Sequence, residues 1–261
     1  MMLLVTIFAI GYALLVLGMG LFQRRLMYLP TAGDIAPALY GLAHFTDMTI
    51  ESEDGTRLQL WYHEAANGQP TIIYFHGNAG HLGDRVGIFA ALAEKGFGVA
   101  AVSYRGYGKS EGRPHEKGIY ADARAAIKWV RSRGIAPTRM AFYGESLGTG
   151  VAVKMATEFA PKHLFLQAPY TSVVRRAAEI YWFVPVRLLI RDHFDSLSLI
   201  RTVRTPLTIF HGRLDRVIPP QHSHELLDAA NEPKRAIFFD TVGHVEFDND
   251  ILAQHVAAGL S

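Results

Sequence analysis

The feature that most constrains this chain is an apolar run that leads into Gly144-Glu145-Ser146-Leu147-Gly148 and then into a second apolar stretch. The run before it, residues 139–143, has the composition of a buried strand, and residues 149–156 are typical of a helix. A serine on a tight turn between a strand and a helix needs small neighbours, because larger side chains would collide with both elements. The pattern therefore predicts a nucleophile elbow at Ser146. Because such a short pattern also arises by chance, only the presence of suitable partner residues elsewhere in the chain can identify Ser146 as a nucleophile.

These partners follow in the order expected for such an elbow, in which an acid precedes a histidine along the chain. Asp215 comes just after the apolar run 206–212, and His244 follows the apolar run 236–239. A serine hydroxyl needs a base to take its proton and a third group to orient that base. We therefore predict Ser146 as the nucleophile, His244 as the base and Asp215 as the acid. The competing acids and histidines, with His211 expected to be structural, are Asp192, Asp195, Asp240, His211, His222, His224 and His255.

A further strand end upstream offers donors for the negative charge that builds on a carbonyl oxygen during acyl transfer. Residues 71–75 run into His76-Gly77-Asn78-Ala79, a glycine-containing turn. We predict an oxyanion hole formed by the N–H of Leu147 and an N–H of this turn, with Asn78 as the first choice and Ala79 as the second.

Two charged residues near these motifs receive no chemical role. We expect Arg105, in the loop Tyr104-Arg105-Gly106-Tyr107-Gly108, to pair with a buried carboxylate. We expect Glu145 to form an outward salt bridge.

Composition limits the classes of function. The chain has 261 residues, of which 49% are hydrophobic, so one large α/β domain with an appendage fits its length. The net charge of +2 comes without a basic tract, which argues against a nucleic-acid partner. The absence of cysteine excludes disulfides, thiol catalysis and thiolate metal sites. We expect neither a metal nor a cofactor.

The N-terminal segment has the length and composition of a membrane anchor. Residues 1–22 carry no charge, and such a stretch spans about 30 Å of hydrocarbon as a helix. A signal peptide and a buried core helix are the alternatives. Arg24 and Arg25 follow at once, which by the positive-inside rule predicts a cytoplasmic catalytic domain. We expect an anchor over residues 1–23 and an irregular linker over 24–44 that lifts the domain off the membrane. No candidate for the triad, the oxyanion hole or the cap lies within residues 1–25.

The remaining chain, residues 45–261, has the pattern of one α/β domain. Two alternating runs around Asp54-Gly55 predict an antiparallel hairpin. From residue 71 onward strands and helices alternate, which predicts a mostly parallel sheet with helices on both faces. The alternation breaks over about residues 170–205, where we expect a small inserted cap. The aromatic and aliphatic centre of this cap, residues 180–191, has three open roles: to line an acyl pocket, to touch the bilayer, or simply to pack on the domain.

Three motifs together resemble the α/β-hydrolase superfamily: Phe75-His76-Gly77-Asn78-Ala79-Gly80, the run 103–112 with its Arg105-Gly106-Tyr107-Gly108 core, and Gly144-Glu145-Ser146-Leu147-Gly148. More narrowly, residues 45–261 with the anchor are similar to the membrane-anchored α/β-hydrolase-domain serine hydrolases, a group that includes protein depalmitoylases. The resemblance implies the α/β-hydrolase fold and the triad Ser146, Asp215 and His244. The depalmitoylases tend to carry Asn-Asp after the histidine, whereas this chain has Val245-Glu246.

The sequence thus favours a membrane-anchored serine hydrolase that cleaves carboxylic esters or thioesters of lipids or acylated proteins. A serine peptidase or amidase on the same fold is the enzymatic alternative, because a fold does not fix a function. A catalytically silent, membrane-anchored binding module is the alternative from another class.

Overall fold

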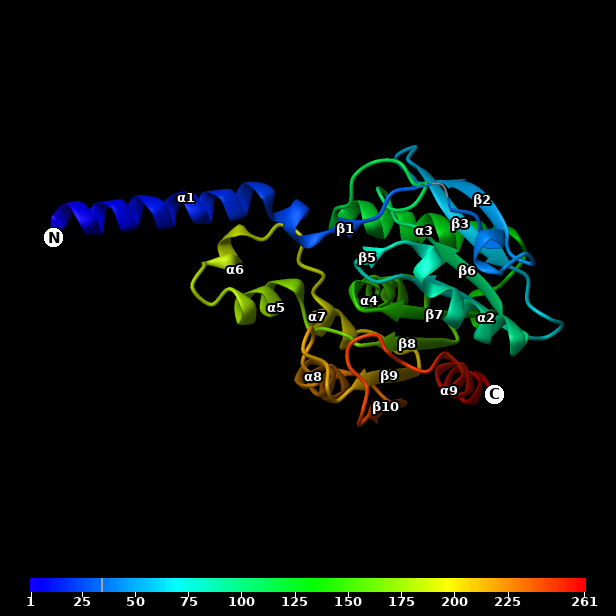
Figure 1. The fold of residues 1–261 in the computed structure, drawn as a ribbon. Coiled ribbons are helices and arrows are strands. Elements are labelled where there is room, and N and C mark those ends of the chain that lie inside the picture. The colour runs from blue at the N-terminus through cyan, green and yellow to red at the C-terminus, as the bar shows by residue number, and fades with distance from the viewer. Residues whose placement is uncertain (34) are drawn as a thin grey trace.

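The computed structural model describes residues 1–33 and 35–261, and within these residues eight strands form one central sheet (Figure 1). Its order is β10-β9-β8-β7-β4-β6-β3-β2, and β3 alone runs in the direction opposite to the other seven strands. The predicted hairpin is therefore confirmed as β2 with β3, and the rest of the sheet is parallel. The strands are β2 (Thr46–Glu51), β3 (Arg57–His63), β4 (Thr71–Phe75), β6 (Gly98–Val102), β7 (Met140–Glu145), β8 (His163–Gln167), β9 (Leu207–Gly212) and β10 (Lys234–Phe239).

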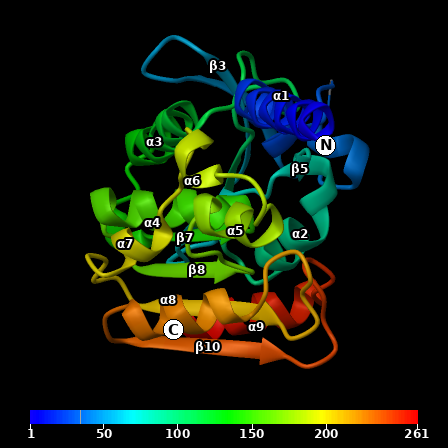
Figure 2. The same ribbon diagram turned by 90° about the vertical axis from the view of Figure 1, so that its left-hand side faces the viewer.

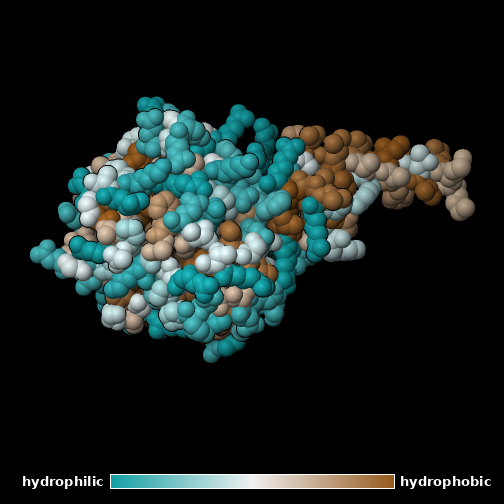
Figure 3. Space-filling view, turned by 180° about the vertical axis from the view of Figure 1, so that it is seen from behind, coloured by the Kyte–Doolittle hydropathy of each residue, from teal (hydrophilic) through white to brown (hydrophobic). Residues whose placement is uncertain are grey.

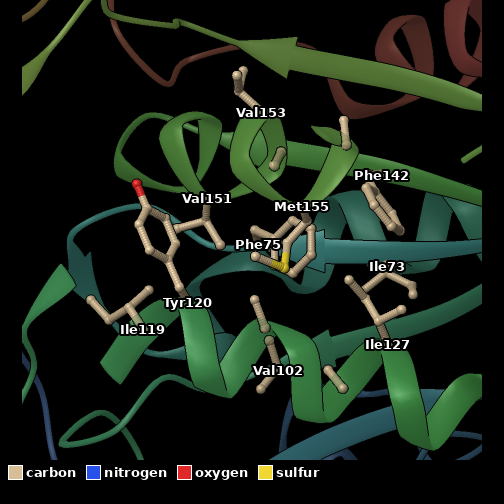
Figure 4. Packing of buried hydrophobic residues seen from close by; sticks show 14 of the residues in the cluster. Ile73, Phe75, Val102, Ile119, Tyr120, Ile127, Phe142, Val151, Val153 and Met155 are labelled. Atoms are coloured by element: carbon tan, nitrogen blue, oxygen red, sulfur yellow. The ribbon is translucent and has the colours of Figure 1, made fainter. Parts of the chain in front are cut away.

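The central strands are apolar along their whole length because both faces of the sheet are covered. On β4, Ile73 and Phe75 point into one hydrophobic cluster, while Ile72 and Tyr74 point into the other. This alternation follows from the two-residue period of a strand. Figure 4 shows Ile73 and Phe75 packed among side chains of the helices α3 and α4.

Helices cover the sheet on two sides, as the alternating pattern predicts. α3 (Glu116–Ser132) and α4 (Leu147–Phe159) pack on one face, with α8 (Gln221–Ala229) between β9 and β10 (Figure 2). α2 (Val86–Glu94) and α9 (Asn249–Leu260) cover the other face and contact each other. Short 3-10 turns are η1 (Pro37–Tyr40), η2 (Leu82–Arg85) and η3 (Pro137–Arg139).

The cap expected over about residues 170–205 lies between β8 and β9. It consists of three short helices, α5 (Val173–Ile180), α6 (Val186–Leu189) and α7 (Ser196–Ile200). The side chains of Ser172 and Asp195 cap α5 and α7 by accepting hydrogen bonds from backbone N–H groups. Figure 1 shows α5 and α6 beside the long N-terminal helix rather than over the centre of the sheet.

That helix, α1 (Met2–Met27), projects from the domain (Figures 1 and 3). Its 26 residues extend over about 39 Å, and among the described residues it is the one helix long and apolar enough to cross a membrane. Figure 3 shows its hydrophobic residues continuing outward from a largely hydrophilic body. A signal sequence meets the same criteria of length and composition, so the structure does not distinguish a signal sequence from a membrane anchor.

The segment after α1 differs from the expected linker. The helix continues through Met27, past the boundary expected at residue 23. The next residue, Tyr28, is buried, and β1 (Leu29–Pro30) pairs in parallel with β5 (Ala79–Gly80). Residues 28–33 therefore pack on the domain and do not lift it away from α1. Besides the pairing of β1 with β5, the N–H of Thr31 donates to Gly80 O at 3.2 Å and the N–H of Gly33 donates to Gly108 O at 3.0 Å.

Arg105 pairs with a buried carboxylate, as expected, and the structure identifies this carboxylate as that of Asp122 on α3. The guanidinium donates from Nε to Asp122 Oδ1 at 3.0 Å and from Nη2 to the same oxygen at 2.7 Å, and Asp122 is fully buried. A second carboxylate, Asp54 in the β2–β3 turn, accepts from Arg105 Nη1 at 2.7 Å. The ion pair fixes the loop after β6 to α3 and to the hairpin.

We predict that Asp122→Ala lowers the free energy of unfolding by about 3–5 kcal/mol, because it leaves a buried guanidinium without its main counter-charge. Chemical denaturation of the full-length protein in detergent measures this loss. The matched control is Glu111→Ala, which breaks the exposed Arg57–Glu111 pair and should leave the unfolding midpoint close to that of the wild type. Equal effects of the two substitutions would contradict a structural role for the buried pair.

Candidate active site

Ser146 stands between β7 and α4 in a conformation that most residues avoid. Its φ is 48° and its ψ is −115°, and a non-glycine residue with positive φ is held there only by its surroundings. The N–H of Ser146 donates to Gln167 O on the neighbouring strand β8 at 2.9 Å, and its C=O accepts from the Thr149 hydroxyl at 2.6 Å. The expected strand, turn and helix are therefore present, and the turn points the serine hydroxyl away from the sheet.

The glycines on either side of Ser146 permit a very close approach of backbone to backbone. A Cβ at Gly148 would lie 1.9 Å from Phe75 O, and one at Gly144 would lie 2.5 Å from Gly148 O. No side chain larger than hydrogen fits at either position. The pattern read from the sequence thus has the steric cause that was inferred for it.

Three side chains from three strand ends form a connected row. Ser146 Oγ lies 2.9 Å from His244 Nε2, and His244 Nδ1 lies 2.7 Å from Asp215 Oδ2. Asp215 follows β9, and His244 follows β10. The structure therefore brings together the three residues predicted from chain order, in the geometry in which a histidine can take a proton from serine.

The carboxylate of Asp215 is held by more than His244. Its Oδ1 accepts from the N–H groups of Val217 and Ile218, both at 2.8 Å, and His211 Nε2 lies 3.2 Å from Oδ2. Burial raises the pKa of Asp215, but hydrogen bonds from His211, His244 and Ile218 outweigh it and hold the pKa well below its usual range. His211, expected to be structural, is fully buried and orients the acid.

The two predicted oxyanion donors lie at the same cavity wall as the serine. Leu147 is the first residue of α4, so its N–H lies at the positive end of the helix dipole. Among the residues that the structure describes, the backbone N–H groups of Asn78 and Leu147 have no acceptor. The side chain of Asn78 is occupied: Nδ2 donates to Met27 O at 2.5 Å, and Oδ1 accepts from the Tyr107 hydroxyl at 3.0 Å. From Asn78, the backbone N–H is thus the donor that remains.

His76 supports the turn that carries Asn78. The ring is fully buried; its Nδ1 donates to Gly77 O at 2.7 Å, and its Nε2 accepts from Tyr104 N–H at 3.2 Å. These partners fix the neutral form, because a second ring proton would point at the N–H of Tyr104. Burial, helped by the nearby Arg85 charge, lowers the pKa of His76 to about 3.

Glu145 forms a salt bridge, but the expectation that it points outward is wrong. Its side chain is almost fully buried, with Arg85 Nη2 2.9 Å from Oε1 and the Tyr74 hydroxyl donating to Oε2 at 2.6 Å. Burial raises the pKa of Glu145, and the attraction of Arg85 together with these hydrogen bonds brings it below its usual value. A Cβ at Gly77 would lie 2.4 Å from Glu145 Oε1, so this ion pair packs directly behind the oxyanion turn.

An apolar cavity of about 290 Å³ ends at Ser146. Leu147 and Asn78 also line it, and residues of the cap make up about half of its lining. One wall is formed by α1, a role that the sequence does not predict for this helix. The α1 residues that line it are Met19, Gln23, Leu26 and Met27, and the cap residues are Val173, Arg176, Ala177, Ile180, Tyr181, Val184, Val186, Leu189 and Ile190.

Sequence reasoning missed this wall because hydrophobicity alone does not tell a lipid-facing helix position from a protein-facing one. One signal was present. Gln23 is a polar residue directly after an uncharged stretch, and its amide donates to Leu189 O at 2.9 Å and accepts from Arg191 N at 2.7 Å. Tyr170, which donates to Leu147 O at 3.1 Å beside the serine, was also missed.

Within the described part of the chain, no group of three or more His, Asp or Glu side chains is arranged to hold a metal ion.

Comparison with known proteins agrees with this architecture. Residues 66–190 match the family model described as "Serine aminopeptidase, S33", an α/β-hydrolase family. Rv2307c of Mycobacterium tuberculosis, itself uncharacterised, is 40% identical over 225 residues, which is 85% of this chain and 80% of that protein. The α/β-hydrolase domain-containing protein WAV2 of Arabidopsis thaliana is 30% identical over 81% of this chain and 75% of its own length.

A zebrafish relative, "Lysophosphatidylserine lipase ABHD12" of Danio rerio, is 29% identical over 76% of this chain and 62% of its own length. Among solved structures, the esterase Pf2001 of Pyrococcus furiosus superposes with a TM-score of 0.73 at 20% identity, covering 89% of this chain and 97% of that chain. The fold and the strand-end site define an α/β-hydrolase. The chain belongs to the α/β-hydrolase superfamily, in the group of α/β-hydrolase-domain proteins.

We predict that the free energy of unfolding falls less steeply in acid for the His76→Gln variant than for the wild type. With its pKa lowered to about 3, His76 takes up a proton in the unfolded chain below about pH 6.5 but stays neutral in the folded protein. The contribution of His76 to the free energy of unfolding is thus fully present above pH 6.5 and is lost as the pH falls toward 3. Between pH 6.5 and 5 the wild type should lose about 1.6 kcal/mol more than the variant. Denaturant unfolding at both pH values tests this, and parallel losses in the two proteins would contradict it.

Proposed function

We propose that this protein is a serine hydrolase that cleaves carboxylic esters or thioesters through an acyl-enzyme on Ser146. The row from Ser146 Oγ through His244 to Asp215, with distances of 2.9 and 2.7 Å, is the observation that carries the proposal. We further propose that α1 anchors the domain of residues 45–261 to a membrane, with Arg24 and Arg25 placing it on the cytoplasmic side.

The geometry supports a two-step reaction. Ser146 Oγ attacks the acyl carbon while His244 Nε2 takes its proton, and Asp215 stabilises the imidazolium that forms. The N–H groups of Leu147 and Asn78 stabilise the oxyanion. His244 then gives the proton to the departing alcohol or thiol. Water then attacks the acyl-enzyme while His244 takes its proton, and His244 returns that proton to Ser146 Oγ as the ester bond breaks and the acid leaves.

The cavity lining favours an acyl substrate over an aminopeptidase substrate, although the matching family model carries an aminopeptidase description. An aminopeptidase must bind the free ammonium of its substrate, for which a carboxylate is the usual partner. Among the described residues that line the cavity there is no Asp or Glu, and most are apolar. The relatives and neighbours described as a lipase and esterases agree with an ester substrate.

We expect Ser146→Ala to abolish labelling by a fluorophosphonate probe and to lower ester hydrolysis by at least about a thousandfold, because the acyl-enzyme needs the hydroxyl. Gel fluorescence and a p-nitrophenyl ester assay measure the two effects. Ser198→Ala, which removes a hydroxyl on α7 outside the cavity, is the matched control and should behave as the wild type. Labelling that persists in Ser146→Ala would end the assignment. A folded wild type that never labels would favour the silent binding module.

We also expect the double variant Ser146→Ala with His244→Ala to be little slower than either single variant. Residues that act in one step are strongly non-additive, because removing either one removes the step. Steady-state kcat/KM for a p-nitrophenyl ester, measured on all four proteins, gives the comparison. Losses that multiply would place the two residues in separate steps. Faster hydrolysis of an aminoacyl p-nitroanilide than of any ester would favour the peptidase alternative.

A further inference from the structure

One face of α1 is turned toward the protein. Met19, Gln23 and Met27 are half-buried, whereas Leu21 between them is exposed. Positions three to four residues apart share one side of a helix, so these residues form a continuous stripe. A Cβ at Gly20 would lie 3.3 Å from Leu189 Cδ2, so α1 and α6 approach closely along the stripe.

Charged and polar contacts fix α1 to the cap. Arg24 binds both oxygens of Asp192, from Nε at 2.8 Å and from Nη2 at 2.9 Å. The Tyr28 hydroxyl donates to the same carboxylate at 3.1 Å, and Asp192 is 3% exposed. A bidentate pair with a buried carboxylate is directional and costly to break. α1 is thereby held in one position relative to the cap.

The cavity runs along this stripe. Its inner end is fixed at the oxyanion turn, since Met27 O accepts the hydrogen bond of Asn78 Nδ2. Met19 also lines the cavity and is eight residues back along the helix, which is about 12 Å along its axis. The space therefore extends from Ser146 outward between α1 and the cap, with the form of a slot for an extended chain.

The outer end of the cap reaches far along the apolar helix. Tyr12 donates its hydroxyl hydrogen to Phe183 O at 2.7 Å, and Tyr12 is 15 residues, or about 22 Å, from Met27. Two apolar side chains of the cap, which we call the cap tip, are exposed: Trp182 is 82% exposed and Leu188 is 87% exposed. Any bilayer that α1 crosses also covers this tip. Arg187, beside Leu188, has a stem long enough to carry its charge to the headgroups.

We propose that α1 and the cap form a single acyl channel that opens into the hydrocarbon of the bilayer, so that the substrate is a long-chain acyl ester taken laterally from the membrane. α1 is then a substrate-binding element as well as an anchor. The inference rests on the proposed function, since the channel ends at Ser146. The observation that supports the acyl channel is the continuity of the apolar helix α1, the apolar cap tip and the apolar cavity.

Narrowing the channel far from the serine should lower kcat/KM for esters with long acyl chains selectively. In the full-length protein in nanodiscs, Met19→Trp should lower kcat/KM for p-nitrophenyl laurate at least ten times more than it lowers kcat/KM for p-nitrophenyl acetate. Leu21→Trp, the same change on the exposed face, should leave both substrates within twofold. Equal effects of Met19→Trp on both esters, or no effect on laurate, would overturn the channel.

A second experiment does not depend on turnover. A long-chain alkyl fluorophosphonate with a terminal diazirine, bound to Ser146 and irradiated, should crosslink to residues of α1 and of the facing cap. A short-chain analogue should not reach Met19. Labelling of Ser146 with crosslinks that miss α1 would overturn the channel alone, whereas absence of Ser146 labelling would overturn the proposed function itself.

Discussion

The constraint on which the site depends is the contact between α4 and the strand β4. Gly148 lies so close to Phe75 O that no Cβ fits, and Ser146, two residues before it, has a positive φ. The same contact places the first N–H of α4 beside the turn after β4, so that the serine and two oxyanion candidates face one cavity. A single steric requirement thus sets both the nucleophile and the charge-stabilising groups.

Buried polar groups hold the loops around that contact. The Glu145–Arg85 pair packs behind Gly77, His76 fixes the turn from inside, and Asp215 is held by two N–H groups and His211. Each group is paired, which is what makes burial of charge tolerable. Such networks leave the site little freedom to rearrange, as preorganised electrostatic catalysis requires.

The fold and the geometry of the row were predictable from the sequence because strand period, glycine sterics and chain order are local signals. Ser146, Asp215 and His244 each follow an apolar run, and parallel strands bring such ends to one edge. The burial of Glu145 was not predictable, since its partner Arg85 is 60 residues away in sequence. The contact of Arg24 with Asp192 spans 168 residues, so the docking of α1 on the cap was also out of reach.

The proposed mechanism requires a covalent intermediate at Ser146, and rapid acid quench followed by mass spectrometry detects that intermediate most directly. Full-length protein mixed with a p-nitrophenyl ester should release a burst of p-nitrophenol equal to the number of active sites. The peptide that contains Ser146 should carry the acyl mass at that residue. An acyl group on a different residue, or full turnover with neither burst nor adduct, would contradict the account.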